Sequence, residues 1–318
     1  MRLHLMLFVF LGMALEAEER QEEVLDRGLV AVRQDDGRAF VSWRKLRGDG
    51  EVGYRLYRVQ DGEAKRVAET VAGAGTNYVD GAGGEEYFLR VLRAGEAGEA
   101  SRRVKVWEKG FLEILLREVP GYRAGDCSVG DLDGDGQYEL VVHQVGESRD
   151  NGSAGVTSVP ILDAYEMDGT FLWRINLGRN IREGEHYTQF MVYDLDGDGR
   201  AEVACKTADG TRDGLGRVIG DGGKDWRTLD EGSQLHGRVL KGPEFLTVFD
   251  GETGGALATV DYVPGRDPLD GWGGIGGNGN NDAYGNRANR FLACVAYLDG
   301  KWPSLVISRE LRCQATRC

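Results

Sequence analysis

The sequence has little of what membrane-spanning, nucleic-acid-binding or disulfide-stabilised proteins need. Beyond its first residues it has no apolar run approaching the roughly 20 residues that a membrane-spanning helix takes. The net charge of −13 comes without a basic stripe, which argues against nucleic acid as a partner. The 318 residues include only 6 prolines and 5 cysteines, an odd and scattered set that does not indicate a disulfide framework. We therefore expect no membrane or nucleic-acid partner.

Motifs of several common catalytic sites are also missing. There is no Cys-x-x-Cys pair or His/Cys cluster for zinc, and no nucleophile triad, phosphate loop or nucleotide fingerprint. Cys127, Cys205 and Cys294 stand singly in or beside apolar segments, so we expect them to be packed thiols.

Residues 1–17 are expected to be a secretory signal peptide. Arg2 precedes an apolar stretch, Leu5–Leu11, that is too short to cross a bilayer, and Gly12–Ala14 offers small residues for cleavage. The alternative, a buried first strand, is disfavoured by the acidic run after Leu15. We predict a secreted or periplasmic protein.

Glycine, by contrast, is abundant. The 49 glycines have no collagen-like period and indicate many tight turns between short strands. Residues 24–107 alternate apolar and polar side chains in short segments such as "RAFVSW" and "EYFLRV", separated by Gly-rich turns. This pattern predicts an all-β fold that begins with a fibronectin type III-like β-sandwich. Its expected core residues are Trp43, Tyr54, Leu56, Tyr87 and Leu89.

Residues 108–318 contain repeats. "SVGDLDGDGQYELVV" (Ser128–Val142) closely matches "MVYDLDGDGRAEVAC" (Met191–Cys205), and "ACVAYLDGKWPSLVIS" begins a third copy without the acidic residues. Repeats of this length in an all-β sequence predict the blades of a β-propeller. Two repeats and the start of a third do not close a ring, so we expect a partial propeller with an atypical C-terminal tail.

Each full repeat carries a ladder of carboxylates. Their spacing matches the front half of an oxygen cage for calcium, which takes about 6–8 oxygen ligands. The twelfth position is Val142 or Cys205, and strands follow directly, so these are not EF-hands. We predict calcium loops that staple each blade's first hairpin; the alternative is calcium that binds a substrate carboxylate. The predicted ligands are Asp131, Asp133, Asp135, Gln137 (carbonyl) and Glu139, and Asp194, Asp196, Asp198, Arg200 (carbonyl) and Glu202.

Basic residues near the repeats are candidates for substrate contact. His143 and Lys206 occupy the same position in the two copies, four residues after the loop glutamate, and should face the same way. Basic groups there could hold an anionic sugar. The polar segment Gly178–Phe190 adds Arg182 and His186. For each of these, the alternative is a solvated or hydrogen-bonded side chain with no ligand.

The string "LWRINLGRNIREGEHYTQFMVYDLDGDGRAEVACKTADGT" resembles the rhamnogalacturonan lyases of polysaccharide lyase family eleven, as do "VGDLDGDG", "GPEFLTVFDGETG" and "YGNRANRFLA". The resemblance covers Leu25 to about Ser308. It implies a β-sandwich followed by a calcium-bound propeller, and β-elimination between rhamnose and galacturonate in rhamnogalacturonan I, a pectic polysaccharide. The expected form is a monomer. Asp150-Asn151 also looks like the family, which adds Asn151 as a candidate substrate contact.

Two features depart from the family pattern. His143-Gln144 stands where members usually have Lys-Trp, and "SRELRCQATRC" replaces an Arg-Gly-Tyr-Tyr-like string. From the tail we expect a truncated chain, weak or inactive as a lyase, and we assign no catalytic base. Two other functions stay open: a non-enzymatic, calcium-dependent glycan-binding or adhesion module, and a glycosidase with two carboxylates about 5–9.5 Å apart.

Overall fold

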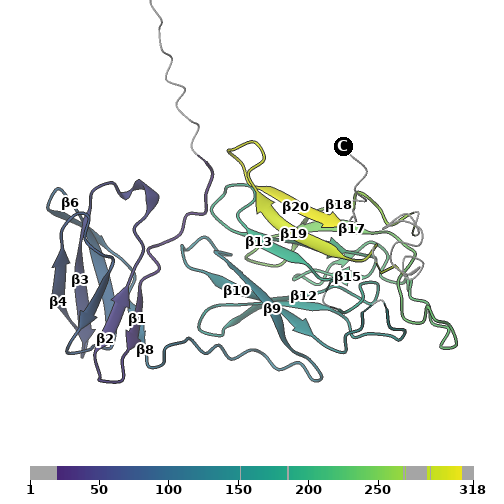
Figure 1. Ribbon diagram of the computed structural model, residues 1–318, viewed down its shortest axis with the longest axis horizontal. Coiled ribbons are helices and arrows are strands. Elements are labelled where there is room, and N and C mark those ends of the chain that lie inside the picture. The colour runs from purple at the N-terminus through teal and green to yellow at the C-terminus, as the bar shows by residue number, and fades with distance from the viewer. Residues whose placement is uncertain are drawn as a thin grey trace, which may run out of the picture.

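The computed structural model describes residues 20–150, 152–184, 186–267, 269, 285–286 and 288–309. Within these ranges the chain is all-β, as the sequence predicts, with one short 3-10 helix at Arg47–Asp49 (Figure 1). No helix among the described residues is long and apolar enough to cross a membrane. The expected signal peptide, the candidate Asn151 and the tail from residue 310 lie outside the described residues.

The first sheet is built from eight strands. They are β1 (Val30–Arg33), β2 (Ala39–Ser42), β3 (Gly53–Gln60), β4 (Glu63–Thr70), β5 (Asn77–Asp80), β6 (Glu86–Arg93), β7 (Glu96–Ala100) and β8 (Val104–Trp107). Their order is β4-β3-β6-β8-β1-β2-β5, with β7 paired to β6. Because β8 pairs with β6 on one side and with β1 on the other, one continuous sheet folds around a common core.

That core contains all five side chains that the alternation predicts, so this prediction is confirmed. Leu56 lies opposite Leu89 across the β3–β6 pair, where the two-residue period turns both to the same face. Trp43 and Tyr54 meet edge to face with ring centroids 5.3 Å apart. Burying each of these side chains contributes about 1.5–3 kcal/mol to folding.

Asp49 ties the segment before β1 to this core. Arg27 donates two hydrogen bonds to its buried carboxylate, at 2.5 and 2.6 Å, and these bonds lower the pKa of Asp49 to about 2. A lowered pKa stabilises the fold above the unfolded value near 3.8, and the contribution is lost as pH falls toward 2. We expect Asp49→Asn to cost about 2 kcal/mol at pH 7 in urea denaturation. The difference in unfolding free energy between variant and wild type should become smaller near pH 2. A difference that does not change with pH would contradict this account.

Three further sheets follow, stacked side by side (Figure 1). The second sheet contains β9 (Arg123–Gly130), β10 (Glu139–Val145), β11 (Ile161–Tyr165), β12 (Phe171–Asn176), β15 (Thr211–Arg212) and β16 (Val218–Ile219). The third contains β13 (Phe190–Tyr193), β14 (Glu202–Thr207), β17 (Phe245–Phe249) and β18 (Ala256–Asp261), and the fourth β19 (Phe291–Ala296) and β20 (Ser304–Arg309). Strand β13 contacts both β9 and β19, so the first strands of successive sheets are neighbours.

The second and third sheets share one apolar core. Val141 and Val203, each on the strand that follows the acidic loop of its own repeat, are both fully buried in it. Trp173 adds a polar link, since its indole N–H donates to the carbonyl of Gly251 at 2.6 Å.

The prediction of packed thiols holds for one of the three cysteines. Cys205 on β14 is buried, whereas Cys127 and Cys294 are exposed free thiols. The alternation of apolar and polar residues assigns a strand side chain to one of the two faces of a sheet. It does not show whether other parts of the protein cover that face. Cys127 lies on β9, which is exposed along most of its length, and the neighbouring residues of Cys294 on β19 are less exposed than it is.

A segment before the first sheet crosses the loops that follow β9, β13 and β19. We call Arg20–Gly28 the N-terminal strap. The amide of Gln21 donates to the carbonyl of Lys301 (2.9 Å), and the Tyr297 hydroxyl donates to the carbonyl of Gln21 (2.5 Å). Farther along, the amide of Asp26 donates to the carbonyl of Gly136 at 2.7 Å. The strap therefore joins the loops of the second and fourth sheets.

Candidate functional site

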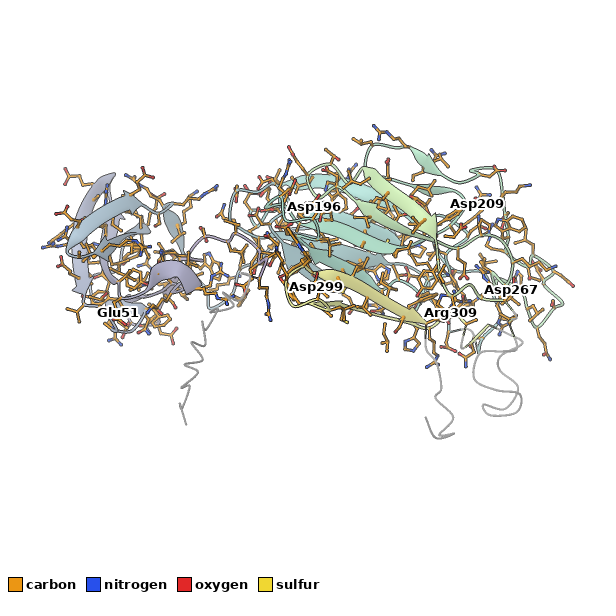
Figure 2. All side chains as sticks on the ribbon, turned by 90° about the horizontal axis from the view of Figure 1, so that it is seen from above. Glu51, Asp196, Asp209, Asp267, Asp299 and Arg309 are labelled. Atoms are coloured by element: carbon orange, nitrogen blue, oxygen red, sulfur yellow. The ribbon has the colours of Figure 1, made fainter. Side chains whose placement is uncertain are left out.

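Charged side chains lie at both ends of the stacked sheets (Figure 2). Asp196 and Asp299 lie at the end nearest the first sheet, and Asp209, Asp267 and Arg309 lie toward the far end (Figure 2). Arg309 shares the carboxylate of Glu244 with Lys206, so Lys206 lies toward the far end, away from the acidic loop of Asp196 (Figure 2).

Backbone amides shape the first acidic loop around Asp131. Its carboxylate accepts hydrogen bonds from the amides of Gly134 (2.8 Å) and Gly136 (2.7 Å), and Glu139 accepts one from the amide of Leu132 (2.6 Å). Gly136 has φ +87°, a conformation that favours glycine. The second loop repeats these contacts: Asp194 with Gly197 (2.6 Å) and Gly199 (3.1 Å), and Glu202 with Leu195 (2.8 Å).

Three carboxylates converge in each loop. Oxygens of Asp131, Asp133 and Glu139 lie within 4.8 Å of one another, and so do those of Asp194, Asp196 and Glu202. Burial, followed by the neighbouring aspartates, raises the pKa of Glu139 and of Glu202 to about 7. Closely spaced, partly buried carboxylates of this kind fit a hard cation that prefers oxygen ligands.

The fourth predicted carboxylate of each loop lies outside these groups of three. Asp135 pairs with Arg102, between β7 and β8, at 2.9 Å, and Asp198 pairs with Arg200 at 3.3 Å. The amides of Gln137 and Arg200 donate to these two aspartates. The ligand roles of Asp135, Asp198 and the two carbonyls stay predictions. To bind the cation, each aspartate would have to give up its ion pair with an arginine.

The third loop is closed without an acidic ladder, as its sequence indicates. Tyr297 stands where the other copies have their first aspartate, and its hydroxyl is 2.7 Å from the Tyr193 hydroxyl. Asp299 accepts hydrogen bonds from the amides of Lys301 and Trp302, both at 2.8 Å. Side-chain and backbone contacts here replace the crowded carboxylates.

His143 and Lys206 make equivalent contacts, in line with their equivalent positions. The His143 Nε2 atom lies 3.0 Å from Glu183 Oε2, and Lys206 Nζ lies 2.8 Å from Glu244 Oε1. All four side chains are buried. Both glutamates were missed in the sequence analysis. The available signal was an acidic residue within the polar segment Gly178–Phe190 (Glu183) or directly before an apolar strand (Glu244).

Lys206 is a buried cation in a cluster of charges. Burial lowers its pKa to about 8, an effect that Glu244 opposes and that Arg266 and Arg309 reinforce. Burial alone would raise the pKa of Glu244, but Lys206 and the two arginines hold it below its ordinary value. The ammonium also lies 4.6 Å from the ring centroid of Phe291. Lys206 thus stays mostly protonated near pH 7.

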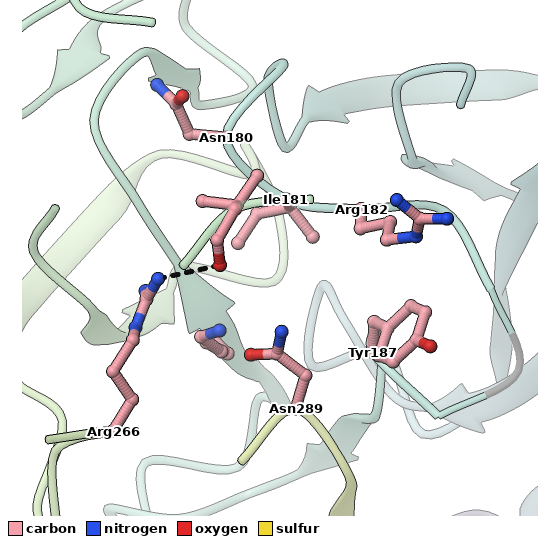
Figure 3. Close-up of a pocket in the computed structure, with 8 residues that line it drawn as sticks. Asn180, Ile181, Arg182, Tyr187, Arg266 and Asn289 are labelled. Atoms are coloured by element: carbon pink, nitrogen blue, oxygen red, sulfur yellow. Dashed lines mark hydrogen bonds between the residues drawn. The ribbon is translucent and has the colours of Figure 1, made fainter. Parts of the chain in front are cut away.

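A polar cavity of about 10 Å³ adjoins this cluster, with room for about one water molecule (Figure 3). Its polar lining consists of Asn180, Arg182, Tyr187, Lys206, Arg266 and Asn289. The Arg182 and Lys206 that the sequence proposed as substrate contacts therefore meet at one cavity. His143 is not among the residues that line it.

Arg182 anchors a neighbouring loop. Its guanidinium donates to the carbonyls of Arg149 (3.2 Å), Gly155 (3.2 Å) and Ser153 (2.6 Å). His186 is half-buried, and its carbonyl accepts a hydrogen bond from the amide of Phe291 at 3.1 Å. These contacts give both residues a structural role; their substrate roles stay predictions.

Two family models match the chain. Residues 20–107 match the rhamnogalacturonan I lyases beta-sheet domain, and residues 118–316 match the C-terminal domain of rhamnogalacturonan lyase family 11. The chain is 48% identical over 309 residues to rhamnogalacturonan exolyase YesX of Bacillus subtilis (93% of this chain, 47% of the relative). It is also 48% identical to rhamnogalacturonan endolyase YesW of the same organism, over 92% of this chain and 46% of the relative.

Solved structures give the same result. The crystal structure of the exotype lyase YesX superposes with a TM-score of 0.80 at 49% identity, covering 91% of this chain and 47% of that one. The Bacillus licheniformis rhamnogalacturonan lyase PL11 gives 0.80 at 46% identity, covering 91% and 49%. The chain spans about half the length of the relatives that it matches. It belongs to rhamnogalacturonan lyase family 11.

Proposed function

We propose that this protein is a polysaccharide lyase that cleaves rhamnogalacturonan I by β-elimination at galacturonate. The observation that carries the proposal is Lys206, a buried ammonium on the wall of a polar cavity, in a chain that belongs to a lyase family. The two Bacillus subtilis relatives are lyases, one exo-acting and one endo-acting, so the family does not set the mode of attack for this chain.

β-Elimination at a uronate removes the C5 proton and breaks the bond from C4 to the leaving oxygen, which leaves a C4–C5 double bond. The C5 proton is acidic enough only when the negative charge of the neighbouring carboxylate is neutralised. Lys206 can supply that positive charge. The cavity has room for one carboxylate oxygen in place of a water, with the sugar ring outside it. No base is assigned among the described residues.

Calcium is proposed as the ion of the two acidic loops. The crowded oxygens of Asp131, Asp133 and Glu139, and their equivalents in the second loop, suit its preference for hard ligands. Bound calcium would neutralise these carboxylates and hold each hairpin closed. The loops lie at the other end of the sheets from Arg309, which favours stapling over contact with a substrate carboxylate (Figure 2).

We further propose the finer architecture and the setting of the protein. The first sheet would be of the fibronectin type III kind, and the later sheets would be blades of an incomplete β-propeller. Support comes from the repeated loop-and-strand pattern and from the contacts of β13 with β9 and β19. A secreted or periplasmic monomer suits a polymeric extracellular substrate and the signal-like residues 1–17.

The proposal is tested by incubating the purified chain with rhamnogalacturonan I and calcium while following the absorbance of the unsaturated uronate. We expect a slow but steady rise, and a rate about 100-fold lower in Lys206→Met, because one electrostatic contact to the developing charge is lost. Lys65→Met, at an exposed position of β4, is the matched control and should keep the wild-type rate.

The alternatives predict other readouts. Calcium-dependent binding of the polysaccharide with no absorbance rise would support the glycan-binding module. New reducing ends without that absorbance would support a glycosidase. Either result from folded wild-type protein would refute the lyase proposal for this chain.

A further inference from the structure

Glu244 is the hub of the buried charge cluster. It directly precedes β17, and its carboxylate meets three cations from three parts of the fold: Lys206 of β14 at 2.8 Å, Arg266 after β18 at 3.2 Å, and Arg309 at the end of β20 at 2.7 Å. The side chain of Glu244 is only 4% exposed. Three ion pairs from different directions therefore hold this buried carboxylate in place.

The backbone fixes the hub as well. The amide of Arg266 donates to Glu244 Oε2 at 3.0 Å, and the amide of Tyr262 donates to the Glu244 carbonyl at 2.9 Å. Both the carboxylate and its own peptide unit are therefore restrained. Lys206, which forms an ion pair with the other oxygen, is restrained through it.

Lys206 depends on this carboxylate for its charge. Burial disfavours the ammonium form, and the guanidinium groups of Arg266 and Arg309 disfavour it further. The face of Phe291 offers a weaker attraction, and Arg182 and Tyr187 are the other titratable groups on the cavity wall. Of the described charged groups with the largest effects on the pKa of Lys206, the two arginines lower it and Glu244 raises it.

We propose that Glu244 is a positioning residue, which keeps Lys206 charged and aimed at the cavity so that its ammonium can receive a carboxylate from an anionic ligand. This inference rests on the proposed function for one point, the identity of the ligand as a uronate. Glu244 itself contacts no ligand. It acts through Lys206.

The test measures the proton affinity of Lys206 directly. The folded chain is pulse-labelled with an amine-selective acylating reagent at a series of pH values, and labelling at Lys206 is quantified by mass spectrometry against exposed Lys65. In wild type we expect a labelling midpoint near pH 8. In Glu244→Gln the midpoint should fall by about one unit or more, a tenfold loss of proton affinity, because the opposite charge within hydrogen-bonding distance is gone.

Two variants separate positioning from a general effect on stability. Glu244→Asp keeps the charge and should give an intermediate midpoint. Glu183→Gln removes the equivalent buried carboxylate beside His143 and should leave the Lys206 midpoint unchanged. Circular dichroism and a urea titration check that each variant is folded under the labelling conditions.

An unchanged midpoint in folded Glu244→Gln overturns the proposal. So does a Lys206 that stays unlabelled up to pH 10 in wild type, since a side chain closed to a small reagent cannot meet a ligand. If the midpoint shifts while the wild-type chain produces no unsaturated uronate, the positioning role stands and the lyase proposal falls.

Discussion

Chelation is expected to lower the melting temperature of the protein by on the order of 10 °C. Each acidic loop brings three carboxylates within 4.8 Å, a repulsive arrangement without a cation. An ion at about 100 times its dissociation constant stabilises a site by about 2.7 kcal/mol, and two loops double this. For a chain of this size each kcal/mol shifts the midpoint by roughly 2–4 °C.

The measurement is a thermal melt with calcium and with a calcium chelator. Glu202→Gln should reduce the response to calcium to that of a single loop. The matched control is Asp299→Asn in the third loop, which lacks the acidic ladder and should respond like wild type. An identical melt in calcium and in chelator would rule out the calcium assignment.

Replacing Gly251 by alanine is expected to destabilise the fold by about 1–3 kcal/mol or more. A Cβ at this position would come within 1.9 Å of the Ala201 carbonyl oxygen, so backbone must move. Gly251 also receives the Trp173 indole N–H, and the amide of Ala201 donates to the carbonyl of Asp131 at 2.6 Å. The substitution therefore disturbs the contact between the second and third sheets and both acidic loops at once.

Urea denaturation gives the stability of Gly251→Ala, and calorimetric titration gives its calcium affinity, which should be weakened along with the stability. Gly110→Ala is the control, because its Cβ would meet no atom within 4 Å and its φ is not in the left-handed region. If Gly251→Ala has the same free energy of unfolding as wild type, the loops can shift without loss of stability. That result would contradict the close packing of Gly251 against Ala201.

Local patterns made much of the fold predictable. Alternation alone identifies Leu56 and Tyr87 as core residues, because a strand side chain's face depends only on its position in the strand. The acidic loops are equally local, since ligands two to eight positions apart are brought together by one glycine-rich turn. The repeat then shows that His143 and Lys206 are equivalent.

Long-range partners were not predictable. Glu183 is 40 positions from His143, and Glu244 is 65 positions from Arg309, so no short pattern connects these pairs. Arg182 shows the same limit. Its charge and polar neighbours indicated a ligand contact, whereas the structure directs its guanidinium to loop carbonyls that a sequence cannot place.

The N-terminal strap has a consequence for folding on the ribosome. Gln21 is among the first described residues to be synthesised. Its carbonyl accepts a hydrogen bond from the hydroxyl of Tyr297, which lies 276 positions later. Both acidic loops are complete long before that partner exists. Asp26 can pair with Gly136 early, but the Gln21 end of the strap must stay undocked until the fourth sheet exists. Its docking closes one of the longest-range contacts among the described residues. Since such contacts slow folding and lengthen exposure of unpaired strands, docking of Gln21 on the fourth sheet should be among the last steps of folding.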